Sequence, residues 1–374
     1  VSTAGNVSSE TIQRYVEEQK TRGGETVQAL TIKIRFFPDN PELLRQLSRE
    51  YIHTVNALTE QAEKQGSFPK VTTKDVDAHL PSAVLNQAIR DAKSVSKKMK
   101  KEGKRPILKK PVYFVNNQNY TIGEQMIAFP IMLDGKTRKT RFRAMVTERD
   151  KNLIQHAKLG LMRIVEKTGK WYAQVSLSIP VTKKKNEKVM GVDLGLKVPA
   201  VAVTSNGKTR FFGNGRQNKY IRRKYQQRRR KLGKLKKLSA IRKMNNKEQR
   251  IMKDINHKIS RQIVNMAIKE DVSVIKLEKL TNIRQTARTS RKNEKHLHTW
   301  SFYQLSKFIE YKAKLAGISV VYVDPKYTSQ HCPQCGTKNK ARDRKYVCRC
   351  GYVAHRDRVG AWNIMKAPVA DGVA

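Results

Sequence analysis

The sequence predicts a multidomain α/β protein, in which a strand-rich first part precedes a second part that alternates strands with helices. In residues 106–180, apolar and polar residues alternate as they do in half-buried strands. After the charged linker "VTKKKNE", the predicted order is strand, strand, strand, helix, strand, helix, strand, which is typical of an α/β sheet with a partly parallel core. The hydrophobic fraction is 38% of 374 residues, which is enough for two or three folded domains.

The first part contains a helical insert between strands. Residues 1–28 are polar and predict a flexible tail, and "LTIKIRFFP" has the alternation of a half-buried strand. Asn40 is placed to cap a helix that has Pro41 at its first position, and a second helix follows Pro81. Strand patterns return after residue 105. We therefore expect a helical insert within a β domain.

In the second part, "KVMGVDLGLKVPAVAVTSNGKTRFF" predicts three strands, with a turn at Asn206 and Gly207 before the third. Residues 216–270 predict a long helical pair. The buried strands "VSVIKLE" and "ISVVYVD" flank the amphipathic helix "SFYQLSKFIEYKAKLAG".

The charge of the chain indicates a polyanionic partner. Lysine and arginine number 78 against 31 acidic residues, which gives a net charge of +47. Basic side chains of this kind bind phosphates and release their counterions. A membrane surface is the competing partner, but no stretch reaches the ~18 apolar residues of a spanning helix, and we see no signal-peptide core. We therefore expect nucleic acid as partner, no membrane, and a place in the prokaryotic cytoplasm near the nucleoid.

The basic charge is densest in "RQNKYIRRKYQQRRRKLGKLKKLSAIRKMNNKEQR", where Glu248 is the one acidic residue. A run of charge is usually a solvated helix face. Here, like charges four residues apart would destabilise the helix without a counter-anion, which favours a nucleic-acid groove. The candidate contact residues are Arg222, Arg223, Lys224, Arg228, Arg229, Arg230, Lys231 and Lys234.

Three carboxylates stand where predicted elements end or begin. Asp193 and Glu278 each end a strand, and Asp357 opens the last helix. Each alone would be a turn, cap or solvated residue, but side chains at neighbouring strand ends converge. Clustered carboxylates repel one another without a cation, and their oxygens suit Mg²⁺ or Mn²⁺. Two such ions ~3.5–4 Å apart support phosphodiester hydrolysis. The order Asp, Glu, Asp fits an RNase H-like nuclease site.

All four cysteines lie close together, as Cys332-x2-Cys335 and Cys348-x-Cys350. Two thiolate pairs at this separation suit one structural, tetrahedral Zn²⁺ in a small ribbon. The alternatives are reduced structural cysteines or disulfides, or a ligand exchanged for His331 or His355. We expect the ribbon to be an insertion between the last strand and the last helix.

These motifs resemble the TnpB family, which is related to the compact type V CRISPR effectors, over nearly all of the chain after about residue 30. "GVDLGLKVPAVAV", "VIKLEKLTNI" and "HRDRVGAWNI" resemble its three RuvC nuclease motifs, which carry the acidic metal ligands. The segment from "WSFYQLSKF" to "CPQCG" is similar to the family's entry into its zinc ribbon, and "LPSAVLNQAIRDA" to its recognition helix. One position departs from the family, because Val359 stands where an Asn is usual.

The resemblance implies an RNA-guided DNA endonuclease of a transposon, which cleaves double-stranded target DNA beside a short adjacent motif. It implies Asp193, Glu278 and Asp357 as catalytic ligands of two Mg²⁺ or Mn²⁺, and one chain per guide RNA from the transposon end. The expected domains are a tail (1–28), a wedge β-barrel (29–40 and 106–182), a helical recognition insert (41–105), a RuvC-like nuclease domain (183–325 and 353–374) and a zinc ribbon (326–352).

Two other functions remain at this point. A nuclease-inactive, RNA-guided DNA-binding repressor would share the fold, but such a protein should have lost at least one of the three acids, and all are present. A DNA transposase would use carboxylates in the order Asp, Asp, Glu, whereas the order here is Asp, Glu, Asp.

Overall fold

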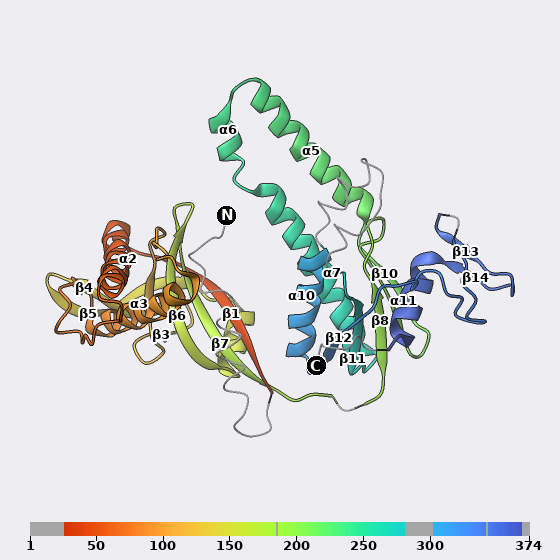
Figure 1. Ribbon diagram of the computed structural model, residues 1–374, viewed down its shortest axis with the longest axis horizontal. Coiled ribbons are helices and arrows are strands. Elements are labelled where there is room, and N and C mark those ends of the chain that lie inside the picture. Colours follow the sequence, from red (N-terminus) through yellow and green to blue (C-terminus); the bar gives the residue numbers. More distant parts are fainter. Residues whose placement is uncertain (1–25, 185, 281–301, 342, 369–374) are drawn as a thin grey trace. The chain divides into compact units, whose positions relative to one another are not determined.

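The computed structural model describes residues 26–184, 186–280, 302–341 and 343–368, in two compact units whose boundary falls between Pro180 and Val181 (Figure 1). Most of the predicted tail and the end of the motif "VIKLEKLTNI" lie outside the described residues. Residues 26–28, which we assigned to the tail, already belong to the first strand. None of the described helices combines the length and the apolar character that crossing a membrane would require.

The first unit is built on one curved sheet. Its strands are β1 (Thr26–Phe37), β2 (Tyr113–Val115), β3 (Thr121–Ile122), β4 (Met126–Leu133), β5 (Lys136–Met145), β6 (Lys158–Lys167) and β7 (Lys170–Val181), in the order β2-β6-β7-β1-β5-β4-β3. Because β2 and β3 are edges and do not pair with each other, the expected barrel is instead a half-barrel. Side-chain contacts between β2 and β4 stabilise the curvature of the sheet. The Tyr113 hydroxyl donates to the Pro130 carbonyl at 2.7 Å, and the Tyr113 and Phe129 rings lie 6.3 Å apart.

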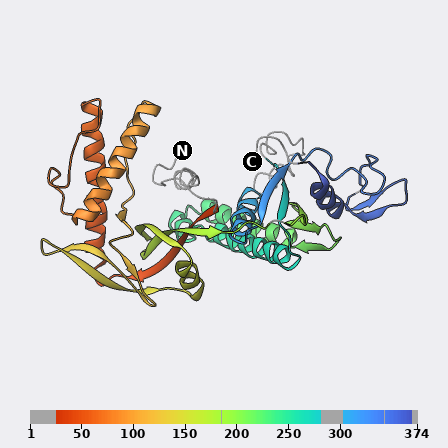
Figure 2. The same cartoon turned by 90° about the horizontal axis from the view of Figure 1, so that it is seen from below.

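Helices α2 (Pro41–Lys64) and α3 (Ser82–Glu102) form the predicted insert between β1 and β2, and lie side by side (Figure 2). The Asn40 side chain caps α2 by accepting from the Leu43 amide at 3.1 Å. The short helix α4 (Glu148–Gln155) between β5 and β6 was not predicted. Thr147 and Asp150 start it with a capping box, which is a local signal that the strand pattern around it concealed.

The second unit contains a five-stranded sheet in the order β10-β9-β8-β11-β12. Its strands are β8 (Val189–Asp193), β9 (Ala200–Thr204), β10 (Thr209–Phe212), β11 (Val274–Glu278) and β12 (Ser319–Val323). Strands β8, β11 and β12 are parallel, whereas β9 and β10 form an antiparallel hairpin, which confirms the partly parallel core.

The helices of the second unit, within the described residues, are α5 (Gly215–Lys234), α6 (Leu238–Lys243), α7 (Lys247–Lys269), α10 (Phe302–Leu315) and α11 (Arg356–Lys366). The predicted helical pair is thus three helices, in which α5 and α7 form the arms of a long hairpin and α6 lies at its far end (Figure 1). Helices α7 and α10 share an apolar core with the sheet, and α11 packs on β8 and β9.

Two glycines let α11 approach β8 very closely. A Cβ atom at Gly191 of β8 would meet the Ala361 carbonyl oxygen at 2.1 Å, well inside van der Waals contact. A Cβ atom at Gly360 of α11 would meet Oδ2 of Asp193 at 2.8 Å. The first turn of α11, which carries Asp357, therefore lies against the end of β8.

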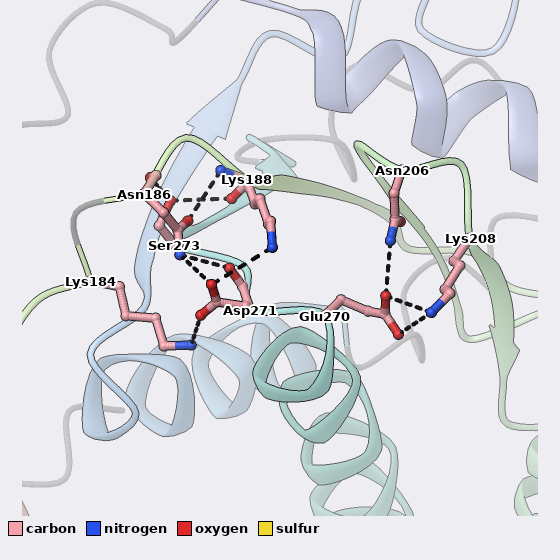
Figure 3. A network of polar contacts seen from close by, with 8 residues as sticks. All are labelled: Lys184, Asn186, Lys188, Asn206, Lys208, Glu270, Asp271 and Ser273. Carbon is pink, nitrogen blue, oxygen red and sulfur yellow. Dashed lines mark hydrogen bonds and ion pairs between the residues drawn. The ribbon is translucent and has the colours of Figure 1, made fainter.

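A polar network fixes the opposite end of the same strands (Figure 3). Asp271, in the turn between α7 and β11, accepts from Lys184 Nζ at 2.8 Å and from Asn186 Nδ2 at 3.0 Å. The Ser273 hydroxyl donates to the Asn186 carbonyl at 2.5 Å, and its amide donates to the Lys188 carbonyl at 2.9 Å. The network holds the entrance to β8 beside the start of β11, and so supports the register in which these strands end side by side.

Candidate functional site

Two of the predicted carboxylates end neighbouring strands. Asp193 is the last residue of β8 and Glu278 the last of β11. The parallel register pairs Val192 with Leu277, so the next residues of both strands, Asp193 and Glu278, leave the sheet at the same edge. Both are partly buried.

The third carboxylate comes from helix α11. Asp357 lies in its first turn, is 7% exposed, and its amide donates to Nδ1 of His355, the N-cap residue, at 3.2 Å. Because α11 lies against β8, Asp357 is close enough to affect the ionisation of Asp193. The structure therefore brings together three acids that are far apart in the sequence.

The electrostatics of this group, the carboxylate cluster, are unfavourable without a cation. Burial and the negative charges of Glu278 and Asp357 raise the pKa of Asp193 well above its usual value. Burial also raises the pKa of Glu278. Acids whose ionised forms are penalised in this way gain most from a nearby positive charge, and perturbed groups of this kind are typical of functional sites.

Arg344 supplies part of that charge. Its Nη1 donates to both oxygens of Asp357, at 2.6 and 2.8 Å. Arg344 comes from the cysteine module, which we define as residues 326–352. The guanidinium also opposes the rise in the pKa of Asp193, as does that of Arg356. Arg344 therefore partly neutralises the carboxylate cluster.

Thr328 of the cysteine module contacts the cluster at another point. Its hydroxyl lies 2.5 Å from Oε1 of Glu278, and the residue is 8% exposed. This hydrogen bond opposes the rise in the pKa of Glu278. The module thus contacts two of the three acids through two different side chains.

The four cysteines of the module form a compact group. Their sulfur atoms all lie within 4.8 Å of one another, with 3.6 Å between Cys332 and Cys350 and 3.5 Å between Cys335 and Cys348. Tetrahedral zinc with Zn–S bonds of about 2.3 Å requires sulfur atoms about 3.8 Å apart, which is close to this arrangement. Hydrogen bonds, first of all the side-chain bond with Thr337, lower the pKa of Cys335 to about 6, whereas burial and hydrogen bonds with the other three cysteines raise the pKa of Cys350 to about 12. The four thiols therefore do not ionise alike, and binding a metal requires them as thiolates. The cysteines are free, so the disulfide alternative was wrong.

The module packs on α11. Strands β13 (Lys345–Val347) and β14 (Val353–His355) form a hairpin that leads into α11. Val359 of α11 is fully buried against Cys332, Tyr346 and Cys348. The departure from the family pattern therefore adds an apolar contact between the module and the helix that carries Asp357. His355 is the N-cap of that helix, and His331 is exposed.

The basic residues of α5 fall into two groups. Arg222 and Arg229 are half-buried and face Glu248 of α7, with nitrogen–oxygen distances of 3.9 and 2.6 Å. The other six candidates point to solvent: Arg223, Lys224, Arg228, Arg230, Lys231 and Lys234. Glu248 thus serves as an internal counter-anion for two residues that we had assigned to nucleic acid.

Arg344 and Thr328 were not among the predicted site residues. Both lie within the segment that we assigned to zinc, where each reads as an ordinary polar residue. Nothing in the local pattern connects them to acids on other elements. Their contacts with Asp357 and Glu278 depend on how the module folds against the sheet.

Two family models match the chain. One, described as "Probable transposase" (OrfB_IS605), matches residues 172–284, which include Asp193 and Glu278. The other, described as "Cas12f1-like, TNB domain", matches residues 302–364, which include the four cysteines and Asp357.

Several curated proteins are similar in sequence. A CRISPR-associated endodeoxyribonuclease Cas12f1 of Sulfoacidibacillus thermotolerans is 33% identical over 53% of this chain and 50% of its own length. Another Cas12f1, of Syntrophomonas palmitatica, is 26% identical over 88% of this chain and 80% of its own. A TnpB-like protein of Methanocaldococcus jannaschii is 38% identical over 34% of this chain and 47% of its own. The chain thus spans about half the length of the first and third of these relatives.

The fold is similar to that of a solved complex. In the cryo-EM structure of a Cas12f1-sgRNA-target DNA complex, the protein is 16% identical and superposes with a TM-score of 0.62. The alignment covers 98% of this chain and 88% of that one. At this identity the likeness shows the fold, which is mixed α/β with a half-barrel sheet.

Proposed function

Because this chain is similar in sequence both to TnpB-like proteins and to Cas12f nucleases, we propose that it is related to both and is an RNA-guided DNA endonuclease. The observation that carries the proposal is the carboxylate cluster of Asp193, Glu278 and Asp357 at one edge of a partly parallel sheet. The strand order, with an antiparallel hairpin beside three parallel strands, supports an RNase H-like nuclease domain of the RuvC type in the second unit.

The donor atoms of the cluster fit divalent cations. Three carboxylates offer hard oxygen ligands, and the raised pKa values of Asp193 and Glu278, caused first by burial, show that negative charge is unfavourable at these two positions. The three acids would hold two Mg²⁺ or Mn²⁺, which supply water activation and charge stabilisation in phosphodiester hydrolysis. Helix α11 and strands β8 and β11 orient the ligands, and Arg344 balances charge at Asp357.

The cysteine module fits one structural zinc ion. Cys332, Cys335, Cys348 and Cys350 complete a tetrahedral set, and the separations of their sulfur atoms are close to those that zinc requires. We assign the module as a zinc ribbon that folds with its metal, since its apolar core consists of few residues.

Guide RNA and target DNA are the proposed partners. The net charge of +47 and the exposed basic residues of α5 suit phosphate backbones. We assign the half-barrel and its helical insert to the wedge and recognition roles, which would hold the guide RNA and a short motif beside the target. The guide would come from a transposon end and act with one chain in the prokaryotic cytoplasm.

One experiment separates this function from its alternatives. The protein is expressed in cells, its co-purifying RNA is sequenced, and a plasmid that carries the complementary target is added with Mg²⁺. We expect the plasmid to be cut at the target. Binding without cleavage would instead indicate an RNA-guided repressor, and joining of DNA strands would indicate a transposase.

A further inference from the structure

Thr328 occupies a position between the two candidate metal centres. It belongs to the segment that leads from β12 into the cysteines, and it precedes Cys332 by four residues. Its side chain is almost completely buried and points to Glu278, which lies fifty residues earlier in the chain. A buried hydroxyl beside a buried carboxylate must form a hydrogen bond to offset the loss of water.

The contact is short and directed. The Thr328 hydroxyl lies 2.5 Å from Oε1 of Glu278 and 3.2 Å from the carbonyl oxygen of Pro325. A hydroxyl donates one proton, and a carboxylate accepts it more strongly than a neutral carbonyl. The proton therefore goes to Glu278. With Oε1 held in this way, the carboxylate cannot rotate freely, so the direction of Oε2 is also fixed.

The backbone of Thr328 is held as firmly as its side chain. Nδ2 of Asn363, on α11, donates to the Thr328 carbonyl at 2.6 Å and to the His331 carbonyl at 2.8 Å. Within the module, the Tyr346 hydroxyl donates to the carbonyl of Gln330 at 2.9 Å, and Tyr346 itself packs on Cys332. The fold around the cysteines therefore determines where the Thr328 hydroxyl lies.

We propose that Thr328 is the positioning residue for Glu278, and that the cysteine module, through Thr328, sets the divalent-ion affinity of the carboxylate cluster. Hydrogen-bonding partners of metal ligands fix ligand orientation, and their loss commonly lowers metal affinity by about 10–100-fold. The inference rests on the proposed function, because it requires Glu278 to be a metal ligand.

The test compares two substitutions of Thr328 in the zinc-loaded full chain. Thr328→Val keeps the volume and removes the hydroxyl, whereas Thr328→Ser keeps the hydroxyl. Binding of Mn²⁺ is measured by titration calorimetry, without nucleic acid and without reference to cleavage. We expect Thr328→Val to weaken Mn²⁺ binding at least about tenfold and Thr328→Ser to stay within about threefold of the wild type.

Asp193→Ala is the reference for the site itself. If it binds Mn²⁺ as the wild type does, the carboxylate cluster is not the metal site, and the proposed function fails together with the inference. If Asp193→Ala loses Mn²⁺ but Thr328→Val does not, only the inference is overturned. An equal loss in both Thr328 variants would also overturn it, because packing would then explain the effect.

Two further variants complete the design. If Thr328→Val does not fold, as judged by near-ultraviolet circular dichroism, Thr328→Ala and Thr328→Ser repeat the comparison with two small side chains. Asn363→Ala releases the Thr328 backbone while every carboxylate is retained. We expect it to weaken Mn²⁺ binding in the same direction, and wild-type affinity would overturn the role of the module.

Discussion

At the scale of single residues, the three acids of the carboxylate cluster differ in their surroundings. Asp357 is paired with Arg344, and Glu278 accepts from Thr328. Asp193 lies where the charges of both other acids act on its ionisation. A cation placed among the three would therefore relieve repulsion most at Asp193, and removal of any one acid would take away a ligand.

Replacement of Asp193, Glu278 or Asp357 by Ala should each reduce DNA cleavage at least about a hundredfold, because the metal ions lose a ligand. Guide and target binding should remain, because phosphate contacts depend on basic surface elsewhere. Asp254→Ala is the matched control, since Asp254 is an exposed acid of α7 that pairs with Lys258 at 2.8 Å and belongs neither to the carboxylate cluster nor to the Asp271 network. Cleavage and binding are measured on one target, and a variant that cuts within about tenfold of the wild type would remove that residue from the site.

The raised pKa of Asp193 predicts a pH-dependent stability. The contribution of Asp193 to the free energy of unfolding is fully present below its pKa in the unfolded chain, about 3.9. This contribution is lost as the pH rises through the higher pKa of Asp193 in the folded protein. Because Asn cannot ionise, the Asp193→Asn variant should not lose stability in this way as the pH rises. Without divalent ions, the urea midpoint of Asp193→Asn should therefore exceed that of the wild type increasingly from about pH 4 upward. Urea midpoints that change with pH in parallel for the two proteins would contradict the raised pKa of Asp193.

At the scale of elements, α5 and the cysteine module add basic side chains and cysteines to the unit built on the five-stranded sheet. Helix α5 displays basic side chains on a hairpin arm that projects from the second unit (Figure 1), and Glu248 neutralises part of its inner side. The cysteine module joins the end of β12 to the start of α11. Both elements thus carry charges or ligands that the five strands alone do not supply.

Replacing Arg223, Arg228 and Arg230 of α5 together by Gln should weaken binding to any guide RNA, because the exposed charges contact phosphates and not bases. The slope of the logarithm of affinity against the logarithm of salt concentration should flatten by up to about 2. Fluorescence anisotropy at several salt concentrations measures both effects. Arg229→Gln is the control, because Arg229 pairs with Glu248 and should affect stability more than binding. An unchanged slope in the triple variant would place the nucleic-acid surface elsewhere.

The cysteine module should hold about one Zn²⁺ per chain, as measured by elemental analysis of protein purified without chelator. Cys332→Ser should lose the metal and loosen the module, since its core is too small to be stable alone. His331→Ala should keep the zinc, because four sulfur atoms already complete the coordination. Protein that contains no zinc would refute the assignment.

At the scale of the whole molecule, the two units divide the work that we propose. The first unit offers a half-barrel with a helical insert, and the second offers the carboxylate cluster, the cysteine module and α5. If base pairing to a guide selects the target, the protein needs only backbone contacts and a short adjacent motif.

Exchange of the guide segment alone should therefore move the cleavage site to the new complementary sequence with no change in any residue. The new ends are mapped by sequencing the cut plasmid, and protein without RNA is the control. Cleavage that stays at the first site, or that proceeds equally without RNA, would leave a plain nuclease in place of a guided one.

Local patterns in the sequence determined where many of the strands, helices and turns lie. The alternation in β1, the cap at Asn40 and the turn at Gly207 predicted elements that the structure contains, since each depends on neighbours within a few residues. The same kind of signal placed Asp193 and Glu278 at the ends of strands and grouped the four cysteines.

Only the tertiary structure decided the contacts between distant residues. Three features join residues on different elements. They are the half-barrel, the pairing of Arg229 with Glu248, and the contacts of Thr328 and Arg344 with the carboxylates. Such contacts arise from how close two elements pack, as Gly191 and Gly360 show at the crossing of β8 and α11. A local sequence pattern does not predict the distance between two elements, because that distance depends on the packing of side chains across the whole unit.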